Sequence, residues 1–257
     1  MASVSWLSIA PVKGLALQHP EEVVLREHGV TENRRFYLVD EDGRRFGLIR
    51  HGPLVQVAAE YDAGAERLEL RFPDGSAAGG RVALGEALTT DFYGRSVTGR
   101  VVEGPWNEAL SQHLGQRLRL VQSDRPGDAV DRGGGGVSLV SDASLDELGR
   151  QAGTEGPVDG RRFRMLLGVA GCRPHEEDGW LGGEVRIGEA RVRLTGTVGR
   201  CAITTQDPET GQRDLDTLRV LKAYRGVSEQ GELDFGVYGH VVEPGRVRVG
   251  DPVEPLV

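Results

Sequence analysis

Short runs of alternating apolar and polar residues fill the first half of the chain and predict a structure made largely of β-strands. An acidic stretch from Asp40 to Gly43 separates two such runs and is typical of a hairpin turn. Short strands separated by Gly and Asp turns favour a barrel or a sandwich. In this half we expect strands near residues 4–10, 23–26, 34–39, 54–61, 67–72, 81–84 and 96–102.

The period changes at residues 105–114, where Trp106, Leu110 and Leu114 fall at helical spacing behind a proline and predict a helix. Two more helices are expected, over residues 141–148 and about 216–224. The rest of this half predicts strands near residues 118–121, 137–140, 161–169, 184–188, 190–198, 201–205, 233–242 and 246–249. We therefore expect two closely packed halves.

Composition narrows the class of protein. The chain has 257 residues, of which 38% are hydrophobic and 27% charged, as in soluble globular proteins. Its formal net charge of −8 argues against nucleic acid as a partner, because phosphate backbones are bound through basic surfaces. No run approaches the roughly 18 apolar residues of a membrane helix, so we expect no membrane association. The start lacks the pattern of a signal peptide, and we expect a cytoplasmic protein.

The chain has two cysteines and six histidines, which limits its metal chemistry. Two thiols cannot build a disulfide framework, and they cannot supply the four thiolates that an iron–sulfur cluster usually needs. The histidines show none of the short paired spacings that are typical of zinc sites. Electrons for a redox reaction would therefore have to come from another protein.

Cys201 is the first candidate for chemistry. It ends an apolar run beside Arg200, and a neighbouring cation favours the thiolate, which attacks electrophiles or binds metals. The stretch Asp-Pro-Glu-Thr-Gly at residues 207–211 predicts a tight turn, so Cys201 is expected at a strand–loop junction. The alternative is a small buried apolar residue. Cys172 follows an apolar run and could be a second ligand, a disulfide partner or a partly buried bystander.

Other residues are candidates for binding an anion. Ser141 would stand at a helix entrance, either as a plain N-cap or where backbone N–H groups receive an anion. Alternation along residues 161–169 would place Arg162 and Arg164 on one face, as an anion site or a solvated edge. Lys13, one of two lysines, lies on an expected strand-end loop, where a solvated role is the alternative.

The segment 123–136 ends in four glycines, has little to bury and is expected to be mobile. A glycine run can cradle a phosphate. Here it lacks the preceding strand and the following Gly-Lys-Ser of known phosphate loops, so the signal is weak.

Several ordered motifs together are similar to those of one known family. They are Pro11-Val12-Lys13, Asn33-Arg34-Arg35-Phe36, Val140-Ser141-Asp142-Ala143-Ser144-Leu145, Arg162-Phe163-Arg164, Glu177-Asp178-Gly179-Trp180, Arg200-Cys201 with Thr204-Thr205-Gln206-Asp207-Pro208, and Val249-Gly250-Asp251-Pro252-Val253. Through them nearly the whole chain resembles the MOSC family, named for the C-terminal domain of the molybdenum cofactor sulfurase. The resemblance is greatest to the branch that includes the mitochondrial amidoxime-reducing component.

This resemblance implies an α+β fold that is mainly β. An N-terminal β-barrel-like domain over residues 1–115 would pack on a MOSC β-barrel with a few helices over residues 116–257. The resemblance also implies a molybdenum cofactor whose metal takes Cys201 as its protein thiolate, and soft sulfur ligation suits such a metal. By matching motif positions, the residues that would hold the pterin and its phosphate are Lys13, Arg34, Ser141, Arg164, Arg200 and Cys201.

The implied activity is reduction of a small N-oxygenated substrate such as a hydroxylamine, an amidoxime or an N-oxide, with a separate ferredoxin- or flavodoxin-type electron donor. Cys201 would hold the metal, Arg200 would stabilise the thiolate or developing negative charge, and Cys172 would be dispensable. Asp207 and His240 are unranked candidates for the proton donor. Two alternatives remain open: a carrier of sulfur or of the molybdenum cofactor, using a Cys201 persulfide or thiolate, and an interaction domain without activity.

Overall fold

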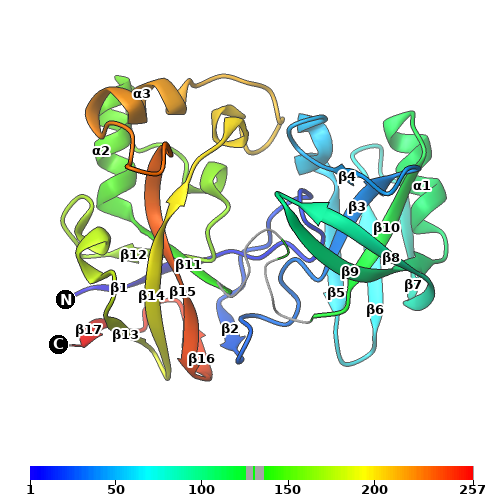
Figure 1. Ribbon diagram of the computed structural model, residues 1–257, viewed down its shortest axis with the longest axis horizontal. Coiled ribbons are helices and arrows are strands. Elements are labelled where there is room, and N and C mark those ends of the chain that lie inside the picture. Colours follow the sequence, from blue (N-terminus) through cyan, green and yellow to red (C-terminus); the bar gives the residue numbers. More distant parts are fainter. Residues whose placement is uncertain (126–129, 131–135, 257) are drawn as a thin grey trace.

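The computed structural model describes residues 1–125, 130 and 136–256. Its strands form two lobes that lie side by side, with both chain termini on the same lobe (Figure 1). Most of the expected mobile segment, residues 126–129 and 131–135, lies outside the described residues. Within the described part of the chain, no helix is both long and apolar enough to cross a membrane.

The lobe that carries the termini is a nearly closed seven-stranded barrel. In sheet order its strands are β1 Ser3–Leu7, β12 Leu167–Ala170, β11 Val137–Ser141, β15 Asp234–Glu243, β14 Ala190–Gly199, β13 Glu184–Ile187 and β17 Val253–Leu256. The two end strands approach each other where Val253 N–H donates to the carbonyl of Ala2 over 2.9 Å. Inward-facing aliphatic side chains, such as those of Val192 and Leu194 on β14, form the core of this lobe.

Two helices cover one end of this barrel (Figure 1). They are α2 Asp142–Ala152, which begins at the N-cap Ser141 and ends at Gly153, and α3 Thr217–Tyr224. Leu148 and Leu221 bring their apolar faces onto Phe235 and the neighbouring strands in a second apolar cluster. This packing fixes the segments that precede both helices.

The other lobe combines two antiparallel sheets with one helix. The five-stranded sheet runs in the order β4 Arg45–Phe46, β3 Phe36–Asp40, β10 Leu118–Ser123, β9 Arg95–Glu103 and β8 Ala83–Phe92, and the three-stranded sheet comprises β5 Ala58–Asp62, β6 Arg67–Arg71 and β7 Ala77–Arg81. Helix α1, Trp106–Leu114, buries Trp106 and Leu110 against this lobe's core. The expected mainly β, α+β fold with an N-terminal β-barrel domain is confirmed.

The two lobes exchange strands across the expected domain boundary at residues 115/116. Strand β1 pairs with β12, and β2, Glu22–Leu25, pairs with β16, Gly245–Arg248, so the start of the chain belongs to the barrel of the second half. Strand β10, just beyond the boundary, pairs with β3 and β9 of the first half. The lobes are therefore joined by crossing chain segments as well as by contact.

Three of the expected strands consist of or begin with 3-10 turns. The strand expected over residues 54–61 begins with η1, Gly52–Gln56, and β5 starts only at Ala58. Residues 161–169 begin with the 3-10 turn η2, Gly160–Phe163, and only β12 is a strand, because Arg164 adopts a left-handed φ of 51° that ends the turn. The alternation that put Arg162 and Arg164 on one face therefore does not exist. Residues 201–205 were also expected to be a strand, but η4, Ala202–Thr205, is a 3-10 turn. The hydroxyls of Thr204 and Thr205 donate to the carbonyls of Cys201 and Ala202, in place of hydrogen bonds to a neighbouring strand.

Candidate functional site

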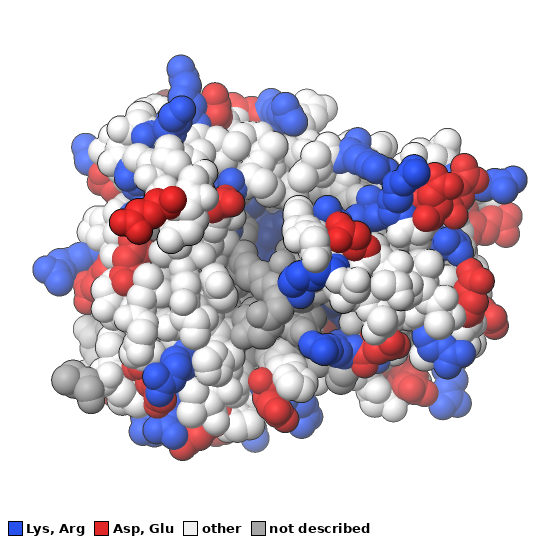
Figure 2. Space-filling view, viewed as in Figure 1, with Lys and Arg blue, Asp and Glu red and all other residues white. Residues whose placement is uncertain are grey.

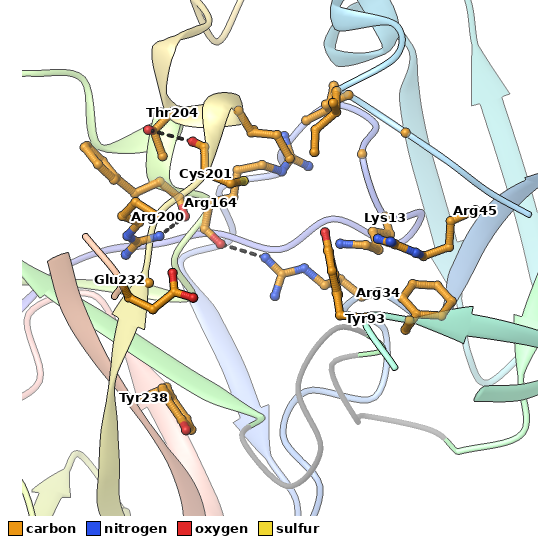
Figure 3. A pocket seen from close by; sticks show the side chains of 18 of the residues that line it. Lys13, Arg34, Arg45, Tyr93, Arg164, Arg200, Cys201, Thr204, Glu232 and Tyr238 are labelled. Carbon is orange, nitrogen blue, oxygen red and sulfur yellow. Dashed lines mark hydrogen bonds between the residues drawn. The ribbon is translucent and has the colours of Figure 1, made fainter. Parts of the chain in front are cut away.

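A cavity of about 1070 Å³ lies where the two lobes meet. Figure 2 shows the surface hollowed between the lobes, with Lys and Arg side chains inside the recess. Lys13, Arg34 and Arg45 of the N-terminal half face Cys201 and Arg164 of the C-terminal half across the space (Figure 3). The cavity is therefore assembled by both halves of the chain.

Cys201 carries an exposed thiol at the edge of this cavity. Strand β14 ends at Gly199, and Cys201 keeps an extended backbone with φ −122° and ψ 177° before η4 begins. Thr204 donates from its backbone N–H and its hydroxyl to the Cys201 carbonyl, both over 3.1 Å. The Thr204 hydroxyl also lies 2.7 Å from that of the buried Thr217 at the start of α3. The expected strand–loop junction is confirmed, and the hydrogen bonds hold its backbone while the thiol faces solvent.

Arg200 points the opposite way, into the protein. Its side chain is buried, and its guanidinium donates to the carbonyls of Phe163, over 3.0 Å, and Phe235. The guanidinium also stacks over the Phe163 ring at 5.1 Å from the centroid. Arg200 thus ties η2 and β15 to the segment that bears Cys201. These contacts favour a role in positioning the loop over direct contact with a substrate.

Arg34 and Arg164 link the two walls of the cavity, because each guanidinium donates a hydrogen bond to a backbone carbonyl of the opposite half of the chain. The Arg34 guanidinium donates to the Arg164 carbonyl over 2.8 Å, and the Arg164 guanidinium donates to the Leu15 carbonyl over 2.6 Å. Both arginines have a left-handed φ, 52° and 51°, which is unusual for residues with a Cβ. Lys13 lies next to them, its backbone N–H bonded to the Phe36 carbonyl. The structure therefore brings together the expected Lys13, Arg34, Arg164, Arg200 and Cys201.

Ser141 lies away from the cavity lining. It is fully buried, and its hydroxyl caps α2 by accepting from Ser144 N–H over 3.1 Å. The carboxylate of the buried Glu177 accepts from the Ser141 N–H, over 3.1 Å, and from the Ser144 hydroxyl, over 2.7 Å. This internal carboxylate stands at the helix entrance, where the sequence suggested that an external anion could bind.

Asp207 also lies outside the cavity lining, within the predicted turn. Its carboxylate accepts from the Thr210 hydroxyl and backbone N–H, both over 2.8 Å, and these bonds hold the pKa of Asp207 below its usual value. A carboxyl that stays ionised is a poor proton donor at neutral pH. His240 is exposed on β15 and does not line the cavity either. Neither Asp207 nor His240 lines the cavity, so the fold does not bring the two expected proton-donor candidates to Cys201.

The turn itself holds the lobes together. Gly211, with φ 72°, ends it and lies directly against Gly52 of η1, Gly52–Gln56, in the other lobe. A Cβ on Gly211 would come within 2.0 Å of the Gly52 carbonyl carbon. Nearby, the buried Gln206 side chain donates to the Leu48 carbonyl over 3.0 Å. Glycine at this position is thus required by both its φ and the close approach.

Sequence reasoning missed several residues of the cavity. Arg45 stacks 3.8 Å from the ring centroid of Tyr93, an exposed side chain at a hairpin tip with φ 57°. Glu232 and Asp234 also line the space. No motif marks any of these four positions, and only the approach of loops far apart in sequence places them here.

Cys172 occupies a different setting. Its half-buried side chain packs beside the core of the barrel lobe, and burial raises the pKa of the thiol to about 11, with Glu176 and Glu177 adding to the effect. Cys172 does not line the cavity. Among the described residues, no cluster of three or more His, Cys, Asp or Glu side chains is placed to hold a metal ion.

Comparisons with known proteins identify both halves of the chain. Residues 1–118 match the MOSC N-terminal beta barrel domain, and residues 133–254 match the MOSC domain. Mitochondrial amidoxime-reducing component 1 of Xenopus laevis is 28% identical over 97% of this chain and 81% of its own length.

Two further relatives match about half of this chain. Component 1 of Mus musculus is 39% identical over 45% of this chain, and component 2 of Homo sapiens is 36% identical over 46%. These matches span only 35% and 36% of the relatives' own lengths. The solved structure of the YUAD protein from Bacillus subtilis aligns over 99% of this chain and 96% of that chain, with 14% identity and a TM-score of 0.44. The two domain matches, over residues 1–118 and 133–254, show that the chain belongs to the MOSC family, as a MOSC N-terminal β-barrel domain followed by a MOSC domain.

Proposed function

We propose that this protein is a molybdenum-dependent reductase of N-oxygenated compounds. The observation that carries the proposal is the exposed thiol of Cys201, which opens into an interlobe cavity lined by Lys13, Arg34 and Arg164. The family relationship, together with relatives named amidoxime-reducing components, supports the choice of substrate class. Hydroxylamines, amidoximes and N-oxides are the compounds that we expect to be reduced.

The donor set fits the cofactor that the resemblance implies. A high-valent metal held by the two dithiolene sulfurs of the pterin would take one further thiolate, and Cys201 is the cysteine that lines the cavity. The pterin phosphate is an anion, and arginine and lysine side chains supply charge-assisted hydrogen bonds to such groups. Among the described residues, seven basic side chains line the cavity, namely Lys13, Arg34, Arg45, Arg50, Arg162, Arg164 and Arg200. Arg162 is buried and pairs with Asp214 at 2.5 Å, and Arg50 pairs with Asp40 at 3.1 Å.

The side chains of the protein would bind the molybdenum cofactor and orient it. Cys201 would hold the metal, with its backbone fixed by Thr204 and by the buried guanidinium of its neighbour Arg200. Lys13, Arg34 and Arg164 would hold the phosphate end. The cofactor, when bound, would supply the two-electron reduction of the N–O group. Electrons would reach it from a separate ferredoxin- or flavodoxin-type protein, because two cysteines cannot hold an iron–sulfur cluster of four thiolates.

The test is to produce the protein in a host that makes the cofactor, and then to measure molybdenum, pterin and activity on the same preparation. We expect near-equal amounts of metal and pterin, and reduction of benzamidoxime only when a ferredoxin or flavodoxin and its reductase are added. Reduction of benzamidoxime with NADH alone would overturn the prediction that a separate electron-donor protein is required. Protein without molybdenum or pterin that carries a persulfide on Cys201, detected by mass spectrometry, would instead favour a sulfur carrier.

A further inference from the structure

The cavity has one acidic end. Among the described residues that line it, the two carboxylates are Glu232 and Asp234, which follow one another closely in the chain, whereas the remaining charged side chains are basic. Figure 3 shows the Glu232 carboxylate below Cys201 and directed toward the cavity, with Lys13, Arg34 and Arg45 on the opposite wall. Both carboxylates therefore come from the half of the chain that carries Cys201, which also contributes Arg162, Arg164 and Arg200, whereas the other half contributes only basic charged side chains among the described residues.

Backbone hydrogen bonds place Glu232 beside the Cys201 segment. Arg200 N–H donates to the Leu233 carbonyl over 2.9 Å, so residues 232–234 run alongside residues 199–200. A turn sets the position of Glu232, because its carbonyl accepts from Ser228 N–H over 2.9 Å and its N–H donates to the Ser228 hydroxyl over 3.1 Å. The loop is therefore held at both of its ends.

Gly199 leaves the room that the Glu232 carboxylate occupies. A Cβ on Gly199 would lie 2.6 Å from the Glu232 Oε2 atom. In extended backbone, residues i and i+2 project to the same side and their Cα atoms are about 6.5 Å apart. Since Arg200 points into the protein, the Gly199 position and Cys201 both face the cavity. The carboxylate therefore stands one side-chain position away from the thiol, on the same surface.

Strand β15 extends this acidic end. Asp234 and Tyr238 line the cavity, while the intervening Phe235 and Val237 are fully buried in the core. This alternation fixes which side chains face the space. Among Glu232, Asp234 and Tyr238, Figure 3 places Glu232 nearer to Cys201 than Tyr238, so Glu232 is the acceptor best placed for a molecule bound next to Cys201.

We propose that Glu232 selects, among N-oxygenated compounds, those that carry N–H groups on the amidine or hydroxylamine unit. This inference rests on the proposed function. The reaction R–NH–OH + 2 e⁻ + 2 H⁺ → R–NH₂ + H₂O breaks the N–O bond, with electrons from the separate donor protein and protons from solvent. The N–H groups of the substrate donate to the Glu232 carboxylate, which orients the N–O oxygen toward Cys201. Amidine products become cationic and keep the same contact, whereas a tertiary amine N-oxide has no N–H to offer.

The experiment compares Glu232→Gln with wild type on two aromatic probes, benzamidoxime, which carries N–H groups, and N,N-dimethylaniline N-oxide, which does not. The KM for benzamidoxime should rise about tenfold, as expected for losing a partly exposed charge-assisted hydrogen bond, while the KM for the N-oxide stays within about twofold. Glu229→Gln is the matched control, because Glu229 is an exposed acid of the same loop that does not line the cavity. It should change neither value. Equal changes for both probes, or none, would overturn the proposal.

A second measurement does not depend on the loaded enzyme. Binding of benzamidinium to the cofactor-free chain, followed by calorimetry, should weaken about tenfold in Glu232→Gln, while binding of acetophenone, an aromatic compound of similar size without an N–H group, is unchanged. Circular dichroism checks that the variant is folded. If wild type reduced neither probe, the proposed function would fail, and the benzamidinium result would still decide for or against Glu232.

Discussion

The two cysteines show how differently one fold can treat the same side chain. Cys201 is exposed on a loop of the barrel lobe that contacts the other lobe, at the edge of a cavity to which the described residues contribute seven basic side chains. Cys172 lies within one lobe, half-buried, near Glu176 and Glu177, with its thiol pKa raised to about 11. The first setting suits a ligand or nucleophile, and the second keeps a thiol protonated and inert. Reactivity here follows from position in the tertiary structure.

Their loops also differ in what they touch. The segment after Cys201 runs to Gly211, which abuts Gly52 of the other lobe. The residue before Cys172, Gly171, packs against the backbone of Met1 within the same lobe. The Cys201 loop is therefore sensitive to how the lobes are joined, whereas the Cys172 loop depends only on its own barrel. Four experiments test this contrast.

The largest effect is expected from replacing the thiols themselves. Cys201→Ser should abolish reduction and change the molybdenum absorption, because an alkoxide oxygen is a harder ligand than a thiolate. Cys172→Ser should keep both within a few-fold. The different roles assigned to the two cysteines would be contradicted if both variants were equally inactive while still folded by circular dichroism. They would also be contradicted if Cys201→Ser kept the wild-type spectrum and rate.

Alkylation should separate the thiols by about a hundredfold or more. At pH 8 a thiol with a pKa of about 11 is ionised in only about one molecule in a thousand, and Cys172 is half-buried as well. Iodoacetamide should therefore modify the exposed Cys201 of the cofactor-free chain first. The Cys172 rate, measured in Cys201→Ser by peptide mass spectrometry, should rise about tenfold per pH unit toward pH 11. A Cys172 rate that is flat above pH 8 would contradict the raised pKa.

Gly211→Ala should destabilise the protein by about 2 kcal/mol or more, because it adds an unfavourable φ and a clash with the backbone of Gly52. Gly153→Ala is a matched control, since Gly153 has the same φ of 72° but no atom within 4 Å of its added Cβ. It should cost about 1 kcal/mol. Urea unfolding of both variants measures the difference. Equal losses would show that the contact between the lobes contributes nothing.

The smallest effect is expected from a single cation of the cavity. Lys13→Ala should lower pterin retention about tenfold, the loss of one charge-assisted contact, with little change in melting temperature. Lys222, the other lysine, is exposed on α3 and outside the cavity, so Lys222→Ala is the control. Arg164→Ala is a less clean probe because it also removes the bond to Leu15. Unchanged pterin content in Lys13→Ala would remove this residue from the phosphate site.

Much of the fold could be predicted because its signals are local. The spacing of Trp106 and Leu110 predicted α1, and the Asp40–Gly43 stretch predicted the hairpin of β3 and β4. Strands with one buried face keep their alternation in the sequence. The failures occur where local signals are weak. Residues 161–169 look like a strand, but Arg164 adopts a left-handed conformation that its bonds to Leu15 and Arg34 hold in place.

The candidate site likewise contains residues that local sequence identified and one, Ser141, whose role local sequence could not decide. Sequence motifs identified Lys13, Arg34, Arg164, Arg200 and Cys201, and the fold places all five around one cavity. They also suggested Ser141, whose environment is set by a carboxylate 36 residues further along the chain. A capping serine and an anion-binding serine have the same local sequence, so only the position of Glu177 distinguishes them.

By itself the sequence determined the strand-rich class and the family, and it singled out Cys201 as the candidate cysteine, because each of these depends on residue types at short spacings. The tertiary structure alone decided that β1 and β10 cross between the lobes, that Arg200 points inward, and that Glu232 stands beside Cys201. Such features depend on contacts between segments far apart in the chain. Their energies are shared among many residues, so no single stretch of sequence carries a signal for them.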